Sequence, residues 1–352
     1  MQSFVCELSV GRVVFGAGAL AHLPREAERL GANRALVLST PGHADLARSI
    51  VEMLGSRAAG TFCGAAMHVP VATAREALRT ARTLSADCLI AIGGGSTTGL
   101  AKAVALESDA PIVAIPTTYA GSEMTPIYGL TEGGEKRTAR DPRVLPRTVI
   151  YDPELTTTLP VGLSVTSGLN AIAHAAEGLY ARDANPFTAL LAEEGLRAIA
   201  GALPAIHRAP RDGAARSQAL YGAWLCGIVL GNAGMALHHK LCHLLGGTFN
   251  LPHSETHAAV LPHAIAYNAP VVPEALERMV RALGRPDPAA ALYDLARDHE
   301  APYSLQALGF AEGDIDRAAE LAVAHPYWNP RPIELEAIRA LLRNAWEGKR
   351  PG

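Results

Sequence analysis

The N-terminal part of the chain alternates short apolar runs with segments in which apolar residues recur at helical spacing. The apolar runs, which predict strands, lie at residues 33–40, 58–64, 87–96 and 110–118. The helical patterns between them lie at residues 73–86 and 97–108. Within these runs CLIAI and PIVAI are apolar without interruption, as strands buried on both faces of a sheet are. This order predicts a parallel sheet covered by helices.

A different pattern occupies residues 127–153. Gly133 and Gly134 separate two short segments of mixed polarity, and prolines interrupt the residues that follow. A glycine pair between two such segments is typical of a hairpin turn. The pattern therefore predicts a β-hairpin with its turn at these glycines, followed by a return segment.

From about residue 160 to the end, apolar positions keep helical spacing and no segment predicts a strand. Proline, glycine and Asn-Pro separate the predicted helical segments, which lie at 160–182, 186–207, 212–246, 255–268, 272–284, 287–299, 303–308, 312–324 and 332–347. We therefore expect two domains, an α/β domain over 1–157 and an all-helical domain over 158–352.

Composition narrows the possible partners. The formal net charge is −3, so no basic surface for nucleic acid is expected. Glycine, histidine or charged residues interrupt the longest apolar runs, and no N-terminal segment resembles a signal peptide. We therefore expect a cytoplasmic protein without a membrane span. The five cysteines form no CxxC pair, which predicts reduced, buried thiols, Cys242 included.

The segment AIGGGSTTGLAKA (91–103) places three glycines between a buried strand and a helix. Glycines let the backbone approach a diphosphate, and the N-terminus of a helix offers N–H groups and a positive dipole end. We expect Gly94, Gly95 and Ser96 to bind the diphosphate of a nucleotide. The segment lacks the G-K-[ST] ending of a P-loop, so hydrolysis of a nucleoside triphosphate is not indicated.

The next strand ends in the hydroxyl-rich segment PTTYAGSE. Ligands of open α/β sheets bind at the carboxyl ends of the strands. We therefore expect Thr117, Thr118 and Ser122 to line the same nucleotide site.

A second glycine-rich stretch, FGAGALA (15–21), also matches a dinucleotide-binding pattern. The next strand, however, ends in Ser39, Thr40 and Pro41, where an acidic residue would bind the adenosine ribose. We interpret the FGAGALA stretch as a tight turn that leads into a helix. If these three residues lie beside the ribose, no carboxylate repels a 2′-phosphate, and both NADH and NADPH are expected to bind.

Six of the thirteen histidines lie between residues 238 and 263. His239 and His243 are four residues apart and share a helix face, as do Asn170 and His174 on another predicted helix. Such spacing suits a metal site, but a lone histidine in an apolar helix more often packs in a core. The residues alone leave both readings open.

Taken together, these motifs resemble the iron-containing (group III) alcohol dehydrogenase family over nearly the whole chain. They are GRVVFGAGAL, GGGST, PTTYAGSE, HHKLCHLLGGTFNLPHSETHAAVLPH and YNAP, in that order. Within the family, GGGSTTGLAKA, PTTYAGSEMTPI, SGLNAIAHA and PYWNPRPI look like the branch that reduces maleylacetate. The resemblance implies an α/β dinucleotide-binding domain followed by an all-helical catalytic domain, the architecture shared with dehydroquinate synthase.

The resemblance also implies where a metal would bind. In metal-dependent members an Asp and a His four residues apart, and two further His, hold the cation; the matching positions here are Asn170, His174, His239 and His253. Three departures stand out: the amide at Asn170, Gly99 in place of an Asp, and Ser254 in place of a Gly. Cations such as Fe²⁺ favour carboxylates over amides, so we expect no metal, although three imidazoles and a water suffice for Zn²⁺.

The implied activity is the NADH- or NADPH-dependent reduction of the C=C bond of maleylacetate to 3-oxoadipate. A conjugated ketone already polarises that bond, so hydrogen-bond donors and an acid can replace a Lewis acid. We expect His243 to be the leading acid–base residue. His174, His239 and His253 would line the pocket as donors, assisted by Asn170.

The remaining expectations concern binding partners and alternatives. The substrate is a small dicarboxylate, for which Arg331, Lys136 and Arg137 are the candidate cations, and the family implies a homodimer. Three alternatives stay open. They are a metal-dependent alcohol or polyol dehydrogenase of the same family, a sugar-phosphate cyclase related to dehydroquinate synthase, and a non-catalytic nucleotide-sensing protein.

Overall fold

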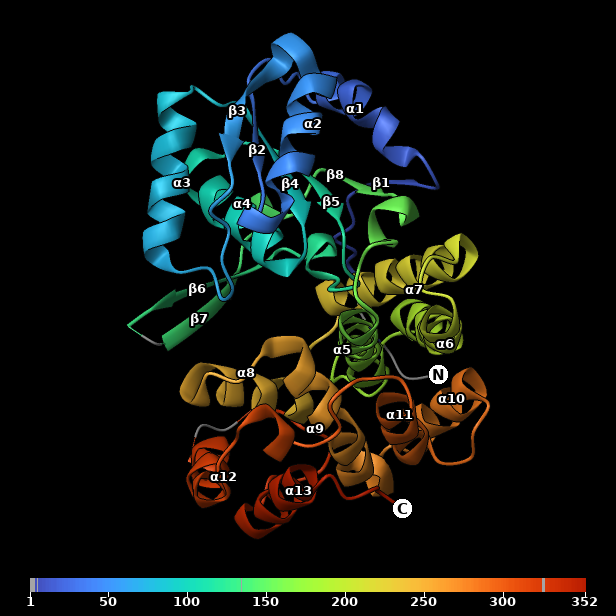
Figure 1. Cartoon of the computed structure of the whole chain (residues 1–352). Coiled ribbons are helices and arrows are strands. Elements are labelled where there is room, and N and C mark those ends of the chain that lie inside the picture. Colours follow the sequence, from blue (N-terminus) through green and yellow to red (C-terminus); the bar gives the residue numbers. More distant parts are fainter. Residues whose placement is uncertain (1–3, 5, 134, 325–326) are drawn as a thin grey trace. The chain divides into compact units, whose positions relative to one another are not determined.

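The computed structural model describes residues 4, 6–133, 135–324 and 327–352, and its chain forms two compact units (Figure 1). One unit spans Leu8–Thr158, and the other contains Leu159–Gly352 together with the described residues before Leu8. The boundary between the two units follows Thr158, one residue beyond the predicted end of the α/β domain at residue 157. The start of the chain was assigned to the α/β domain, and this is wrong for its described residues. Cys6 lies in the helical unit, with its Sγ 3.8 Å from Oδ1 of Asn185.

The α/β unit is built on one six-stranded sheet in which every pairing is parallel. Its strand order is β1-β8-β5-β4-β2-β3. The strands are β1 (Arg12–Phe15), β2 (Ala35–Leu38), β3 (Ala58–Phe62), β4 (Cys88–Gly93), β5 (Ile112–Pro116) and β8 (Thr148–Tyr151). The parallel sheet predicted from the apolar runs is confirmed.

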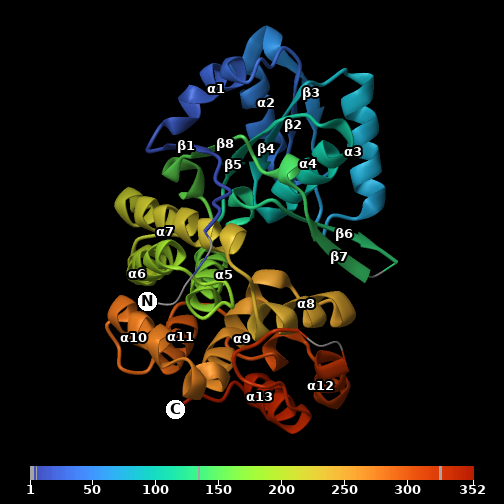
Figure 2. The same ribbon diagram turned by 180° about the vertical axis from the view of Figure 1, so that it is seen from behind.

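Helices cover both faces of this sheet, as Figures 1 and 2 show from opposite sides. They are α1 (Leu23–Arg29), α2 (Ala44–Leu54), α3 (Val71–Thr83) and α4 (Gly95–Ser108). Successive strand residues point to opposite faces. Accordingly Val37 and Ile90 pack in a cluster with α1 and α2 residues, whereas their neighbours Leu36 and Leu89 pack with α3 and α4 residues. This two-sided burial explains the uninterrupted apolar runs.

A separate antiparallel hairpin joins β5 to β8. Its strands are β6 (Ile127–Glu132) and β7 (Glu135–Arg140), and Gly133 in the turn has a φ of 59°. The hairpin predicted in this region is confirmed; Gly134 lies outside the described residues. In both views the hairpin extends away from the six-stranded sheet.

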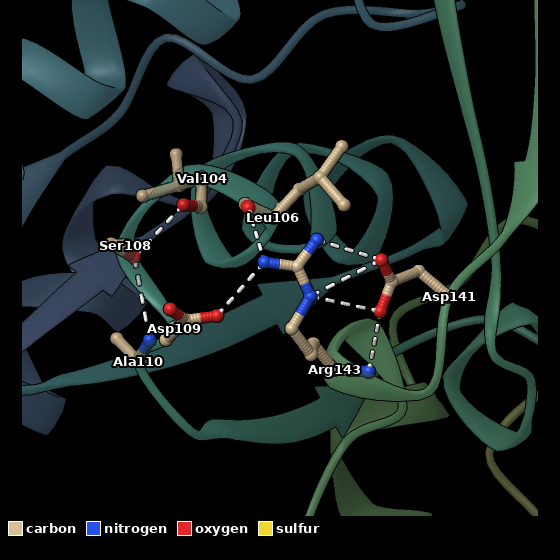
Figure 3. A network of polar contacts seen from close by, with 7 residues as sticks. All are labelled: Val104, Leu106, Ser108, Asp109, Ala110, Asp141 and Arg143. Atoms are coloured by element: carbon tan, nitrogen blue, oxygen red, sulfur yellow. Dashed lines mark hydrogen bonds and ion pairs between the residues drawn. The ribbon is translucent and has the colours of Figure 1, made fainter.

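Arg143 fastens the return from the hairpin to the end of α4 (Figure 3). Its Nη1 donates to Oδ1 of Asp109 at 3.0 Å and to the carbonyl oxygen of Leu106 at 3.2 Å, and its Nη2 donates to Asp141 at 2.7 Å. A cation is favourable at the C-terminal end of a helix, where carbonyl groups lack intrahelical partners. The contact orients the chain as it enters β8.

The second unit is helical throughout the residues described. Its helices are α5 (Val161–Leu179), α6 (Pro186–Arg208), α7 (Gly213–Asn232), α8 (Leu237–Phe249), α9 (His253–Asn268), α10 (Pro273–Leu283), α11 (Pro288–Arg297), α12 (Ile315–Ala324) and α13 (Leu335–Glu347). Helix α5 is buried from Ser164 onward and packs against α6, α7 and α9. This central position brings the polar residues of α5 into contact with other helices.

The predicted helical segment 212–246 is divided in the structure. Residues 233–236 separate α7 from α8, and the two helices meet at an angle of 93°. Both flanking segments have helical periodicity, so the break left no clear mark in the pattern. Among the described residues no single helix is long and apolar enough to cross a membrane, and only this bent pair passes by length and composition.

Candidate active site

The carboxyl ends of β2, β4 and β5 form one edge of the α/β unit. These three strands are neighbours in the order β5-β4-β2, although they are not consecutive in the sequence. The edge therefore gathers most of the residues predicted to bind the cofactor. They are Ser39, Thr40 and Pro41 after β2, Gly94, Gly95 and Ser96 after β4, and Thr117 and Thr118 after β5.

The turn between β4 and α4 requires glycine for steric reasons. Gly93 has a φ of +145°, and a Cβ there would lie 2.6 Å from Oγ1 of Thr97. A Cβ on Gly94 would lie 3.0 Å from Oγ1 of Thr118. Helix α4 begins at Gly95, so the N–H groups of Gly95 and Ser96 in its first turn have no partner within the helix. The geometry suits an anionic group such as a diphosphate.

Three hydroxyl oxygens around this turn are buried and have no hydrogen-bond partner among the described residues. They belong to Thr97, Thr117 and Ser122. Buried polar groups are normally paired, so such a concentration of unpaired hydroxyls points to a bound ligand. Thr97 was not among the predicted site residues.

Lys102 of α4 holds the loop that contains Ser122. Its buried Nζ donates to the carbonyl oxygens of Ser122 at 2.6 Å, Thr125 at 2.8 Å and Ile127 at 2.7 Å. Burial lowers the pKa of Lys102 to about 7, and the nearby Glu123 opposes that shift. Lys102 thus fixes the loop after β5 beside the glycine turn.

The end of β2 contributes less than expected. Ser39 is buried, and its hydroxyl donates to the carbonyl oxygen of Thr40 at 3.0 Å. The Thr40 hydroxyl lies 3.1 Å from Nδ1 of His43. Both side chains are occupied locally, because Pro41 begins a short 3-10 helix at this point.

The predicted histidines form one cluster in the helical unit. Asn170 and His174 lie on α5, and the other members lie on α8 and α9. Ring centroids are 5.0 Å apart for His174 and His239, 6.2 Å for His239 and His243, and 6.3 Å for His243 and His253. The structure therefore brings together histidines that are up to 79 positions apart in the sequence, from 174 to 253.

The cluster also contains His238 and His257, which were not among the predicted site residues. Both rings are fully buried, and Nε2 of His238 lies 2.9 Å from Nδ1 of His257. Cys242, expected in the core, is also buried, with its Sγ 3.7 Å from Nε2 of His238. Both histidines are therefore buried members of the cluster.

Exposure varies systematically through the cluster. His238 and His257 are fully buried, His174 and His239 nearly so, and His243 is exposed. Burial, reinforced by neighbouring histidines, lowers the pKa of His174, His238 and His257 well below the usual histidine range. These three rings are therefore neutral near pH 7. His243, in contrast, is exposed to solvent.

Polar atoms without partners occur here as well. Nδ1 of His174, Nε2 of His239 and Oδ1 of Asn170 are buried and have no hydrogen-bond partner among the described residues. The other ring nitrogen of His239 lies 2.7 Å from the carboxylate of Glu177. The unpaired atoms mark the part of the cluster that is available to a ligand.

The predicted substrate cations lie on different elements. Arg331 donates to the carbonyl oxygen of Tyr267 at 2.8 Å and stacks on its ring at 4.3 Å. Its other N–H groups leave Arg331 a candidate for binding a substrate carboxylate. Arg137 lies in β7, and Lys136 is paired with Thr131 there, but its side chain lies outside the described parts of the chain.

Comparison with known proteins identifies the family. The model for iron-containing alcohol dehydrogenase matches residues 11–153, and the model for the C-terminal part of the Fe-containing alcohol dehydrogenase family matches residues 164–346. The chain belongs to the iron-containing alcohol dehydrogenase family. The expected fold class, an α/β domain with a helical C-terminal domain, is thereby confirmed.

Relatives within the family narrow the comparison. A maleylacetate reductase from Burkholderia cepacia is 60% identical over 351 residues, with both chains covered completely. The crystal structure of maleylacetate reductase from Rhizobium sp. strain MTP-10005 has a TM-score of 0.96 and 56% identity, covering 100% of each chain. An iron-containing alcohol dehydrogenase from Corynebacterium glutamicum has a TM-score of 0.95 and 42% identity, covering 100% of this chain and 99% of its own.

The family name implies iron, but the donor set fits this ion poorly. Non-haem Fe²⁺ sites commonly combine two histidines with a carboxylate. Here Asn170 supplies an amide at the carboxylate position, and the nearby Glu177 is occupied by His239 and by backbone N–H groups. The group His238, Cys242 and His257 has ligand atoms within 4.8 Å of one another, but its two histidines already bond to each other. We derive no step through a metal.

Gly99, where the family motif has an Asp, has a packing reason. A Cβ at this position would lie 2.7 Å from Cγ2 of Val69. An aspartate side chain would need Val69 to move. The packing of Val69 against Gly99 therefore favours a residue without a side chain at this position.

Proposed function

We propose that the protein reduces the C=C bond of maleylacetate to give 3-oxoadipate, with NADH or NADPH as the reductant. The observation that carries this proposal is full-length identity of 55–60% to proteins named maleylacetate reductase. Two further features support it. The glycine turn suits a dinucleotide diphosphate, and the histidine cluster has an amide where a metal ligand would need a carboxylate.

The proposed reaction is balanced by one hydride and one proton. When bound, NAD(P)H would supply a hydride to one carbon of the C=C bond, and the π electrons would move onto the conjugated ketone as an enolate. The enolate then returns its electron pair to the neighbouring carbon, which takes a proton. NAD(P)H is oxidised to NAD(P)⁺, and the substrate gains two hydrogens.

His243 is the proposed proton donor in this step. It is the exposed member of the cluster, so it can recover a proton from solvent after each turnover. The neutral ring of His174, together with His253 and Asn170, would donate hydrogen bonds to the substrate and its enolate, whereas His239, whose Nδ1 lies beside Glu177, would act through Nε2 as an acid–base group. Neutral groups suffice because the enolate charge is spread over a conjugated system.

The dinucleotide would bind at the carboxyl edge of β2, β4 and β5. Gly94, Gly95 and Ser96 would hold the diphosphate, with the unpaired hydroxyls of Thr117 and Ser122 beside them. Thr118 borders Gly94 from the next strand. The end of β2 carries no acidic residue, so both cofactors are expected to be used. A preference for NADH above about a thousandfold in kcat/KM would contradict this, since it needs about 4 kcal/mol of discrimination.

The proposal extends to the protein's partners. The substrate is a small dicarboxylate, for which Arg331 and, in the hairpin, Lys136 and Arg137 are the candidate cations. We also propose a metal-free homodimer in the cytoplasm that binds neither nucleic acid nor membranes.

The direct test follows NADH absorbance with maleylacetate as substrate and 3-oxoadipate as the product measured. Turnover that survives dialysis against a chelator supports the full proposal. Loss of activity with the metal, restored by Fe²⁺ or Zn²⁺, would instead favour a metal-dependent alcohol dehydrogenase. The unpaired atoms of Asn170, His174 and His239 give that second function its structural basis.

A further inference from the structure

Glu177 is a fully buried carboxylate that the sequence did not single out. It lies on α5, one turn after His174, and its side chain reaches the start of α8. Its oxygens accept the backbone N–H groups of Ala236 at 2.9 Å and His238 at 2.7 Å. They also accept Nδ1 of His239 at 2.7 Å.

The contacts explain how a buried charge is tolerated. The residue that precedes α8, Ala236, has no side chain able to cap the helix. Glu177 supplies that cap from α5, so its charge lies at the positive end of the α8 dipole and among N–H donors. Glu177 thus links the start of α8 to the orientation of His239.

The same contact defines which atom of His239 faces the cluster. An ionised carboxylate can only accept hydrogen bonds, so Nδ1 carries the hydrogen and donates it. Nε2 is the remaining ring nitrogen, and it is buried without a hydrogen-bond partner among the described residues. The centroid of the His239 ring lies 5.0 Å from the centroid of the His174 ring.

We propose that Glu177 is a positioning residue that sets the tautomer and ring orientation of His239 for reaction with substrate. Glu177 touches no reacting atom itself and acts through His239. The inference rests on the proposed function for its kinetic consequence, whereas its structural part, the Nδ1–H tautomer, stands apart from any substrate.

A carboxylate is needed here because every neighbour of Glu177 is a donor. The amide of Glu177→Gln would keep one acceptor oxygen and bring an NH₂ group against N–H donors. The ring of His239 would then lose its fixed direction, while the polypeptide could keep one of the capping bonds. This predicts a variant that folds and binds cofactor but turns over slowly.

The kinetic test is a double-mutant cycle with Glu177→Gln and His239→Ala. We expect Glu177→Gln to lower kcat about 100-fold in the wild-type background, within the range of a misplaced acid–base group. In the His239→Ala background the same change should cost less than about threefold, because the residue through which it acts is gone. Equal losses in both backgrounds would overturn the proposal in favour of a purely structural role.

Asp183→Asn is the matched control. Asp183 also accepts a backbone N–H in the segment between α7 and α8, that of Gly234 at 2.8 Å, but it is exposed. We expect its kcat to stay within twofold of wild type. Fluorescence titration with NADPH should give similar Kd values for all these variants, and a matching loss in Asp183→Asn would overturn the specific role of Glu177.

A second measurement separates this inference from the proposed function. Ring-nitrogen NMR of the wild-type protein, with His239→Ala for assignment, should show the hydrogen on Nδ1 of His239. A wild-type ring protonated on Nε2 alone would overturn the inference, even if maleylacetate is reduced. Conversely, the expected tautomer in a protein that fails to reduce maleylacetate would refute only the proposed function. Because the NMR measurement uses the wild-type protein, it tests the inference even if the Glu177→Gln variant does not fold.

Discussion

The glycine turn after β4 and the histidine cluster of α5, α8 and α9 reach a defined geometry in different ways. The turn is one contiguous stretch whose backbone shape follows from the absence of side chains at Gly93 and Gly94. The cluster joins residues of three helices, and carboxylate and ring contacts between helices orient its members. The turn should therefore control cofactor affinity, whereas the cluster should control the rate of the chemical step.

The largest expected effect is in the cluster. His243→Ala should lower kcat for maleylacetate about 100- to 10,000-fold, because a positioned acid is lost. The Kd for NADH should stay within twofold, as measured by fluorescence titration. His207→Ala, at a half-buried histidine of α6 that packs on His299 outside the cluster, is the control and should retain wild-type rates. Retained activity in His243→Ala would remove that residue from its proposed role.

A substitution in the glycine turn should have the opposite effect to His243→Ala, changing the Kd for NADH rather than kcat. Gly94→Val places methyl groups against Thr118 and into the space proposed for the diphosphate. We expect the Kd for NADH to rise about 10- to 100-fold, equivalent to an overpacking cost of about 1–3 kcal/mol. The kcat at saturating cofactor should change little. Gly201→Val is the control, since no atom lies within 4 Å of a Cβ there; equal Kd values for both variants would contradict the assignment.

Lys102→Met tests the support beneath the turn. The change removes the donor to the carbonyl oxygens of Ser122, Thr125 and Ile127, of which that of Thr125 is buried, and an unpaired buried acceptor costs about 1–3 kcal/mol. We expect the free energy of unfolding to fall by about 2–5 kcal/mol, measured by urea denaturation. Lys349→Met, an exposed lysine near the C-terminal end, should be neutral. An unchanged midpoint for Lys102→Met would show that the buried ammonium is dispensable.

A smaller effect is expected in the pH dependence of stability, through His263 in the C-terminal half of α9. Burial lowers the pKa of His263 from 6.5 to about 4, so the folded protein binds its proton less readily than the unfolded chain. Stability should therefore decrease as the pH falls from about 6.5 toward 4, by about 1.4 kcal/mol per pH unit from this group. His263→Leu should reduce the slope of the urea midpoint against pH in that window. An identical slope in both proteins would refute this contribution.

The smallest expected effect is that of metal removal. Because Asn170 gives the cluster no carboxylate at the ligand position, exhaustive chelation should change kcat less than about twofold. Elemental analysis of the purified protein measures the metal content directly. Stoichiometric iron or zinc, with activity that depends on it, would make the cluster a metal site and reverse the comparison with the turn.

Local patterns in the sequence anticipated much of the fold. Uninterrupted apolar runs that alternate with helical patterns predicted the parallel sheet, and the glycine turn was predicted as a nucleotide-binding element from the contiguous residues 91–103. Such features depend on the backbone preferences of residues close together in the chain, which the sequence expresses directly. The resemblance of the motifs to a family was confirmed by full-length matches.

Other features required the tertiary structure. The sequence contained Glu177 on the same helix as Asn170 and His174, but nothing in its spacing showed that it would cap α8 and orient His239. Likewise Arg331, a candidate substrate cation, proved to be bound to Tyr267. The sequence by itself determined most of the helices and strands and the glycine turn, because these follow from local periodicity and backbone sterics, whereas the break between α7 and α8 did not. Which polar side chains meet, and which remain unpaired, was decided only when distant helices packed together.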